Sequence, residues 1–150
     1  MSTKNGNTGT ENFLAEIYTN VKMGADSIVN VLSKVEQGDL RDELTREIKE
    51  YEEYAHKAEK MIYDMGDTPK EENIIAKMSA KLGMAMNTMT DSTPNHIAQM
   101  VIEGATMGIT ELIRLIRENE NGDCSEKALK LAKDVVAFEE DTVERMKKFL

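Results

Sequence analysis

The sequence predicts an all-α protein that folds as a four-helix bundle. Apolar residues recur at helical spacing through several long segments, and glycines, prolines and capping residues separate these segments. The chain has only 2 prolines and no tryptophan, and Ala, Glu, Lys, Leu and Met are abundant, which favours helix. Its 150 residues suffice for one domain with a proper core. We expect a disordered tail over residues 1–10 and a single helical domain over residues 11–150.

The first helix is predicted over residues 10–36. Leu14, Val21, Ile28 and Val35 recur every seven residues and form a coiled-coil-like apolar stripe. This stripe carries no charged residue, so the helix is expected to pack one face into the core.

The second helix is predicted over residues 39–65, between Gly38 and Gly66. Glycine suits the turn at a helix end, and Asp39 can cap the start of this helix. Its core face carries a single acid among apolar and aromatic residues. The face comprises Leu40, Leu44, Glu47, Ile48, Tyr51, Ala55, Ala58, Ile62 and Met65.

Residues 66–93 are predicted to form a long, partly helical crossover. Residues 68–71, with the sequence Thr-Pro-Lys-Glu, form a capping box with proline in the first helical position. They start a short methionine-rich helix that ends near Met89.

The third bundle helix is predicted from Pro94, with Thr93 as its cap, to about Asn119. Asp123 or Ser125 caps the last helix, which reaches the C-terminus. Short connections join the first two helices and the last two, so each of these pairs is expected to be antiparallel. The crossover returns the chain along the bundle, and the predicted order of directions is up-down-down-up.

Composition excludes several classes of function. The net charge of −9 argues against binding to nucleic acid or to anionic membranes, and it is compatible with a basic partner. No apolar run reaches about 18 residues, so no membrane span is expected. The single cysteine, Cys124, cannot form an intrachain disulfide and fits a reducing cytoplasm. We interpret it as a bystander thiol.

A long crossover between the second and third bundle helices is the topology of ferritin-like proteins. Over residues 11–150 the chain resembles a small ferritin-like bundle, and also short uncharacterised bacterial proteins of that shape. The resemblance implies metal ligands from two Glu-x-x-His pairs and two further glutamates. The one literal match, Glu53 to His56, falls on the outer side of the second helix at about 100° per residue, and we predict that it is solvated.

The strongest chemical signal is a pair of acids on the apolar stripes, Glu47 and Glu139. A buried carboxylate is costly unless it is paired, hydrogen-bonded, protonated or bound to a metal. One interpretation is a shared divalent cation with an oxygen-rich ligand set, supported by Glu50, Thr142 and Tyr51. The other is that each glutamate hydrogen-bonds a buried hydroxyl or extends outward. In the predicted topology the two residues lie within about 5 Å along the bundle axis.

Glycines stand where a metal-binding bundle would place its other mid-helix ligands, at Gly24, Gly104 and Gly108. Glycine lets two backbones approach closely. We therefore expect the first and third bundle helices to pack tightly and to shrink the central cavity.

Methionines mark a candidate interaction surface, because exposed thioethers suit adaptable contacts. This surface comprises Met84, Met86 and Met89 in the crossover, and Met100 and Met107 on the polar side of the third bundle helix.

No phosphate loop, dinucleotide fingerprint or nucleophile elbow occurs, and an enzyme is not the favoured interpretation. The leading hypothesis is a cytoplasmic, non-enzymatic bundle that forms a homo-oligomer, most simply a dimer, or binds a protein partner. The first alternative is a reduced carboxylate bundle that stores or handles a divalent metal ion through Glu47 and Glu139. The second alternative is an acidic inhibitor that binds a basic protein.

Overall fold

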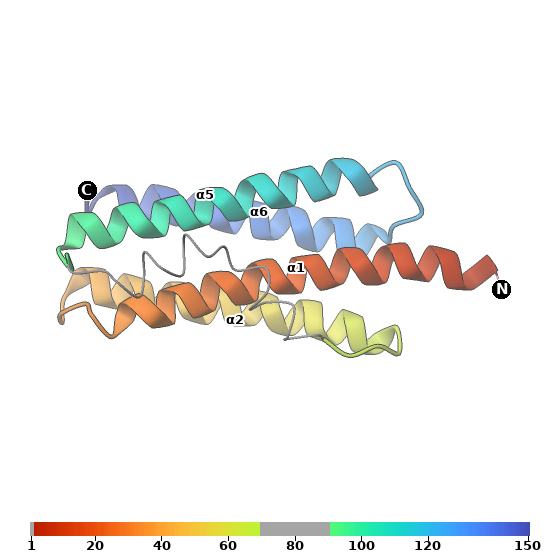
Figure 1. Cartoon of the computed structure of the whole chain (residues 1–150), viewed down its shortest axis with the longest axis horizontal. Coiled ribbons are helices and arrows are strands. Elements are labelled where there is room, and N and C mark those ends of the chain that lie inside the picture. Colours follow the sequence, from red (N-terminus) through yellow and green to blue (C-terminus); the bar gives the residue numbers. More distant parts are fainter. Residues whose placement is uncertain (1, 70–90) are drawn as a thin grey trace.

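The computed structural model describes residues 2–69 and 91–150, with side chains from residue 9 onward. Four helices make up the described chain, which confirms the predicted all-α four-helix bundle (Figure 1). They are α1 (Ser2–Leu32), α2 (Asp39–Asp64), α5 (Pro94–Asn119) and α6 (Glu126–Lys147). None of these helices is both long enough and apolar enough to cross a membrane.

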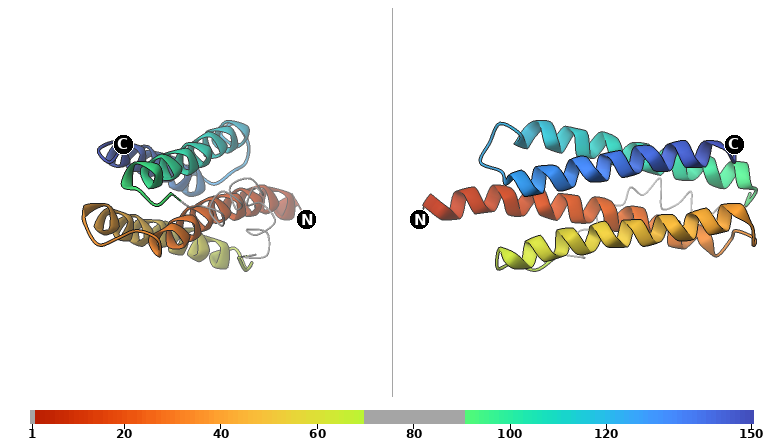
Figure 2. Two further views of the ribbon diagram at one scale, coloured as in Figure 1. Left: turned by 60° about the vertical axis from the view of Figure 1, so that its left-hand side comes forward. Right: turned by 180° about the vertical axis from the view of Figure 1, so that it is seen from behind.

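Two helical hairpins form the bundle, α1 with α2 and α5 with α6. The hairpins pack so that α1 lies against α5 and α2 lies against α6. Following the colours along the chain, α1 and α6 run one way along the bundle and α2 and α5 run the other, as the view from behind also shows (Figure 2). The directions are therefore up-down-down-up, and each of the four pairs named above is antiparallel, whereas α1 and α6 contact each other as a parallel pair.

The first helix is longer at its start than the sequence indicates. It begins at Ser2, so residues 2–10 are helical rather than the expected disordered tail. No proline interrupts these residues, and extending an existing helix adds one hydrogen bond per residue without a new nucleation step. The buried Thr10 also ties this end of the helix to α6, because its hydroxyl accepts a hydrogen bond of 3.2 Å from the Ser125 amide.

The same helix ends at Leu32, earlier than predicted. The side chain of Arg41 takes over the carbonyl groups that the helix leaves free, because its Nη1 donates to the carbonyls of Leu32 at 3.0 Å and Val35 at 2.7 Å. Val35 stays buried in the turn that follows. The stripe therefore ends in a turn that a neighbouring side chain caps.

The other helices begin and end at the glycine and capping residues that the sequence predicts, with one correction. Gly38, at φ 150°, is the N-cap of α2, and Asp39 is its first helical residue rather than its cap. Gly66, at φ 81°, follows the end of α2 in a conformation that favours glycine. Thr93 and Ser125 precede α5 and α6 as predicted, and the Ser125 hydroxyl accepts from the Ala128 amide at 3.4 Å.

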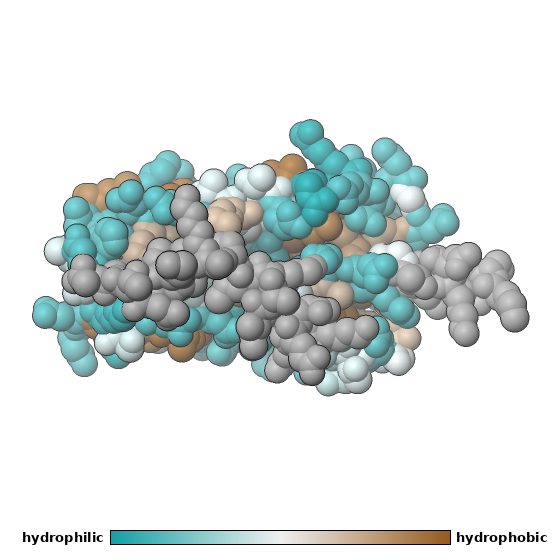
Figure 3. Space-filling model, viewed as in Figure 1, coloured by the Kyte–Doolittle hydropathy of each residue, from teal (hydrophilic) through white to brown (hydrophobic). Residues whose placement is uncertain are grey.

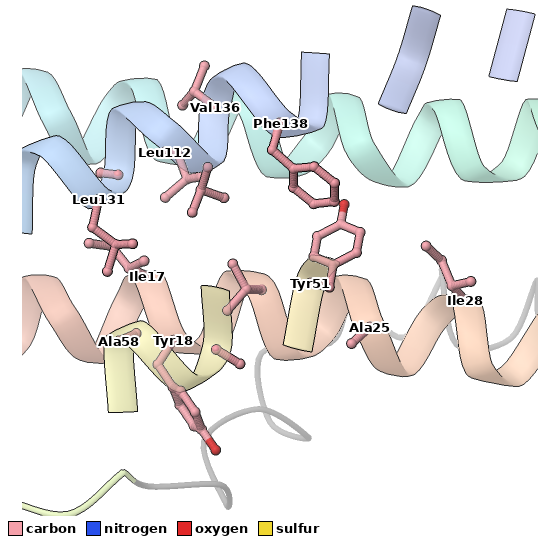
Figure 4. Packing of buried hydrophobic residues seen from close by; sticks show 14 of the residues in the cluster. Ile17, Tyr18, Ala25, Ile28, Tyr51, Ala58, Leu112, Leu131, Val136 and Phe138 are labelled. Carbon is pink, nitrogen blue, oxygen red and sulfur yellow. The ribbon is translucent and has the colours of Figure 1, made fainter. Parts of the chain in front are cut away.

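The core lies along the bundle axis and draws on all four helices. Figure 4 shows Tyr51 pointing from α2 toward Phe138 of α6, and their rings meet edge to face with centroids 4.7 Å apart. On the face drawn in Figure 3, the coloured atoms of the helices are mostly hydrophilic. The predicted methionine-rich helix of the crossover, with Met84, Met86 and Met89, lies outside the described residues.

Candidate functional site

Both acids of the apolar stripes are buried, as the helical phase predicts. Glu47 on α2 is 0% exposed and Glu139 on α6 is 1% exposed. Their surroundings differ, and this difference defines the candidate site.

Glu47 has partners for both carboxylate oxygens. The Thr142 hydroxyl donates to Oε2, and the Arg145 guanidinium donates to Oε1 at 3.1 Å. Burial raises the pKa of Glu47, while the hydrogen bonds from Thr142 and Arg145 and the charge of Arg145 oppose that rise. Glu47 is therefore a buried carboxyl group with its own hydroxyl and its own cation.

The guanidinium of Arg145 lies close to carboxylates of two helices, α2 and α6. Its guanidinium lies 2.6 Å from Asp141 on its own helix, 3.7 Å from Glu50 and 3.8 Å from Glu43. The sequence interpretation missed this arginine. Its position three residues after the inward-facing Thr142, hence on the same side of α6, is the signal that indicates it.

Glu139 has no comparable partner. Its Oε1 atom is buried and makes no hydrogen bond to any residue of the described chain. Burial alone raises the pKa of Glu139 well above the usual range of a glutamic acid, which favours the neutral form. The carboxyl group lies against Gly108 of α5, where an added Cβ would come within 2.9 Å of its Cδ.

A cavity of about 460 Å³ lies beside this carboxyl group, walled mainly by α1 and α5. Glu139 from α6 and Tyr51 from α2 also line it, so all four helices contribute. Its described apolar lining comprises Met23, Ile28, Val31, Met100, Val101, Ala105 and Met107.

The expectation that the glycines shrink the central cavity is wrong. Gly24 accommodates the ring of Tyr51, because a Cβ there would lie 2.7 Å from the ring carbon Cζ, and Gly108 accommodates the carboxyl group of Glu139. Gly104 faces open space, with no described atom within 4 Å of the position of a Cβ. The missing side chains make room for side chains of other helices and for the cavity.

Asn20 of α1 adds a second polar atom without a partner. Its Nδ2 donates to the Gly108 carbonyl at 3.1 Å, which leaves its Oδ1 facing elsewhere. That oxygen is buried and has no hydrogen-bond partner within residues 2–69 and 91–150. Asn20 and Glu139 both line the cavity and both adjoin Gly108. The sequence interpretation missed Asn20, although it lies one helical turn before Gly24 on the same face.

The predicted supporting residues divide between the two acids. Thr142 and Glu50 belong to the surroundings of Glu47, whereas Tyr51 lines the cavity with Glu139. The described residues contain no group of three or more His, Cys, Asp or Glu that could hold a metal ion. A cation shared by Glu47 and Glu139 stays a prediction.

The other sequence-predicted positions are placed as follows. Glu53 and His56 are exposed, as predicted, and His56 Nδ1 lies 3.8 Å from the carboxylate of Glu59 on the same helix. Met107 is 51% exposed, but Met100 is only 7% exposed, so its place on the predicted interaction surface is wrong. Met100 faces the cavity because it lies one turn before Gly104 on the inner side of α5.

Cys124 is half-buried, and burial raises the pKa of its thiol despite its place just before α6. A raised pKa disfavours the reactive thiolate. This agrees with the interpretation of Cys124 as a bystander.

Comparison with known proteins assigns no family. No protein-family model matches the chain, and neither a curated protein nor a solved structure is similar enough to count as a match. The described chain is an all-α four-helix bundle, and the cavity with its buried carboxyl group is the feature from which function can be inferred.

Proposed function

We propose that the protein is a binding protein that holds a small, mostly apolar molecule in the cavity between α1 and α5. The observation that supports it most is the Oε1 atom of Glu139, which is buried in the cavity wall without a partner in the described chain. Buried polar atoms in native proteins nearly always have a hydrogen-bond partner, because leaving one unpaired costs about 1–3 kcal/mol. Because Glu139 lines the cavity, a molecule bound there with a polar group can pair with its carboxyl group after a small side-chain rotation.

The cavity has the properties of a small-molecule site. Its volume of about 460 Å³ falls in the range of about 300–1,000 Å³ that is typical of ligand pockets. Such pockets combine an apolar lining with a few polar groups that orient the ligand. Here Met23, Ile28 and Val101 belong to the apolar lining, and Glu139 and Asn20 are the lining residues that carry a buried oxygen without a partner in the described chain. The core between facing helices is where bundles build their ligand sites.

Gly104 provides the test. A leucine at this position extends into the cavity, meets no described atom near its Cβ and forms helix better than glycine. We expect Gly104→Leu to weaken binding of a hydrophobic fluorescent probe at least tenfold while the variant unfolds at the same or a higher temperature. Gly104→Ala is the matched control and keeps the binding. Equal probe binding by the leucine variant and the parent would contradict the proposal, as would a cavity that takes up no probe at all.

Self-association is also proposed, because Met107 presents an exposed thioether on α5 beside the cavity. Sedimentation at several protein concentrations tests it, and a strict monomer would contradict it. We further propose a cytoplasmic location, a ferritin-like kinship without a di-iron ligand set in the described residues, and no enzymatic role. The acidic-inhibitor alternative has no supporting contact in the described chain.

A further inference from the structure

We infer that the ligand carries an ammonium group, and that Glu139 and Asn20 together recognise it. This inference rests on the proposed function and names the chemical class of the molecule in the cavity.

Two residues of the cavity lining carry unpaired oxygens that accept hydrogen bonds once Glu139 is ionised. Oε1 of Glu139 and Oδ1 of Asn20 are the two buried atoms in the described lining that lack a partner. The orientation of Asn20 follows from its neighbour, because the carbonyl of Gly108 can only accept and the Nδ2 atom therefore faces it. A ligand that satisfies both oxygens must bring N–H or O–H donors. An ammonium group brings up to three N–H donors and no acceptor.

Charge favours a cation over a neutral donor. Arg114 is the only base in the described cavity lining, and it is paired with Glu111 at 2.6 Å and with Glu118. Glu16 and Glu111 add acidic side chains to the lining, and the whole chain has a net charge of −9. An anion therefore finds no unpaired base in the described lining, whereas a cation finds a carboxyl group to pair with.

The lining favours an organic cation over a metal ion. Ca²⁺ takes about 6–8 oxygen ligands, and Mg²⁺ requires a near-octahedral shell. The described residues contain no group of three or more His, Cys, Asp or Glu that could hold a metal ion, and Glu139 and Asn20 share the cavity lining with apolar side chains such as Ile28, Val101 and Ala105. A compact apolar body with one ammonium group matches both parts of the cavity.

Binding changes the protonation of Glu139. Burial favours its neutral form in the free protein, so an ammonium ligand displaces one proton: R–NH₃⁺ plus Glu139–COOH gives R–NH₃⁺ paired with Glu139–COO⁻, and H⁺ goes to the solvent. The other titratable groups of the described lining are Glu16, Tyr51, Glu111 and Arg114. A neutral ligand of the same shape displaces no proton.

Three probes of nearly equal shape separate the possibilities: 1-adamantanamine, 1-adamantanol and adamantane-1-carboxylate. We expect isothermal titration of the full-length protein to show the amine binding at least tenfold more tightly than the alcohol, and the carboxylate binding most weakly. Titration in two buffers of different ionisation enthalpy should show proton release, up to one per amine bound, and none for the alcohol.

Glu139→Gln should abolish both the preference for the amine and the proton release. Glu47→Gln is the matched control, because Glu47 is equally buried but lies outside the described cavity lining. It should keep both effects, with circular dichroism checking that each variant is folded. Equal affinity for amine and alcohol, tighter binding of the carboxylate, or binding of the fluorescent probe alone would overturn the inference and leave the proposed function standing. Failure of every probe, the fluorescent one included, would overturn the proposed function as well.

Discussion

The two buried glutamates stand on the same kind of helical stripe, yet one has partners and the other does not. Glu47 accepts hydrogen bonds from Thr142 and Arg145, whereas Glu139 lines a cavity and its buried Oε1 has no partner in the described residues. The partners of Glu47 partly compensate the cost of its burial, because they oppose the rise in its pKa. An acid without a partner costs stability until something binds to it. The comparison separates a structural acid from a candidate recognition acid.

The largest expected effect comes from removing the cation of Glu47. Arg145→Met leaves a buried carboxyl group without its charge partner and should lower the free energy of unfolding by about 2–3 kcal/mol, below the range for fully buried pairs because Arg145 is 30% exposed. Denaturant unfolding at neutral pH measures it. Arg114→Met is the control, since its pairs are exposed and should contribute less than about 1 kcal/mol. An equal loss of unfolding free energy in the two variants would contradict the assignment of Arg145 as the charge partner of Glu47.

Alanine substitutions at two glycines beside the cavity should change the stability of the protein in opposite directions. At Gly24 a Cβ meets the ring of Tyr51, which packs against Phe138 and cannot move easily, so Gly24→Ala should destabilise by about 1–3 kcal/mol. At Gly104 the Cβ meets open space, so Gly104→Ala should stabilise by about 0.5–1 kcal/mol through helix propensity. Thermal unfolding of both variants tests this, and a shift of the same sign in both would contradict the geometry.

Replacing each of the two acids by glutamine should also change the free energy of unfolding in opposite directions. A glutamate whose folded pKa is raised holds its proton more tightly in the folded state, so its contribution to stability falls as pH rises from the ordinary value of 4.5 through the folded pKa. Glu139→Gln removes this loss and should stabilise the protein at pH 8 relative to the parent.

The pKa of Glu47 is raised as well, but less than that of Glu139, because Thr142 and Arg145 stabilise its charged form. Glu47→Gln should therefore destabilise by about 1–3 kcal/mol, because the loss of the charge that faces Arg145 outweighs the relief of this smaller rise. Urea unfolding between pH 4.5 and pH 8 measures both variants, the lower limit being the ordinary pKa of the carboxyl group. A flat pH profile of the parent, or stabilisation by both changes, would contradict the difference between the two acids.

The smallest expected effect is on the metal content of the purified protein. Because Glu47 is occupied by Arg145 and Glu139 adjoins an apolar cavity, we expect less than stoichiometric metal in protein purified without chelator. Elemental analysis of the parent and of the double variant Glu47→Gln, Glu139→Gln checks this. Stoichiometric metal that disappears in the double variant would favour the metal-handling alternative.

Helical phase was enough to predict the burial of Glu47 and Glu139 and the exposure of Glu53 and His56. Connection lengths were enough to predict the four-helix bundle. Both depend on spacing within one helix or on the number of residues between helices, and the sequence displays these directly.

The partners of the two acids depend on distances between helices, which spacing does not reveal. Arg145 reaches Glu47 across 98 residues, and Asn20 reaches the Gly108 carbonyl across 88 residues. The role of the glycines was mistaken for the same reason. A glycine marks a close approach, but only the packed structure shows whether a backbone, a ring as at Gly24, or a carboxyl group as at Gly108 approaches it.

The hydrogen bond that the Thr142 hydroxyl group donates depends on whether Glu47 is ionised. The Thr142 oxygen lies within hydrogen-bond distance of both Glu47 and the Phe138 carbonyl, at 3.1 Å from the latter, and it has a single hydrogen to donate. When Glu47 is ionised, that hydrogen turns toward the carboxylate. When Glu47 gains a proton, Thr142 accepts it in a hydrogen bond and turns its own hydrogen back to the helix. The vibrational frequency of the Phe138 carbonyl, isotopically labelled, would therefore follow the titration of Glu47.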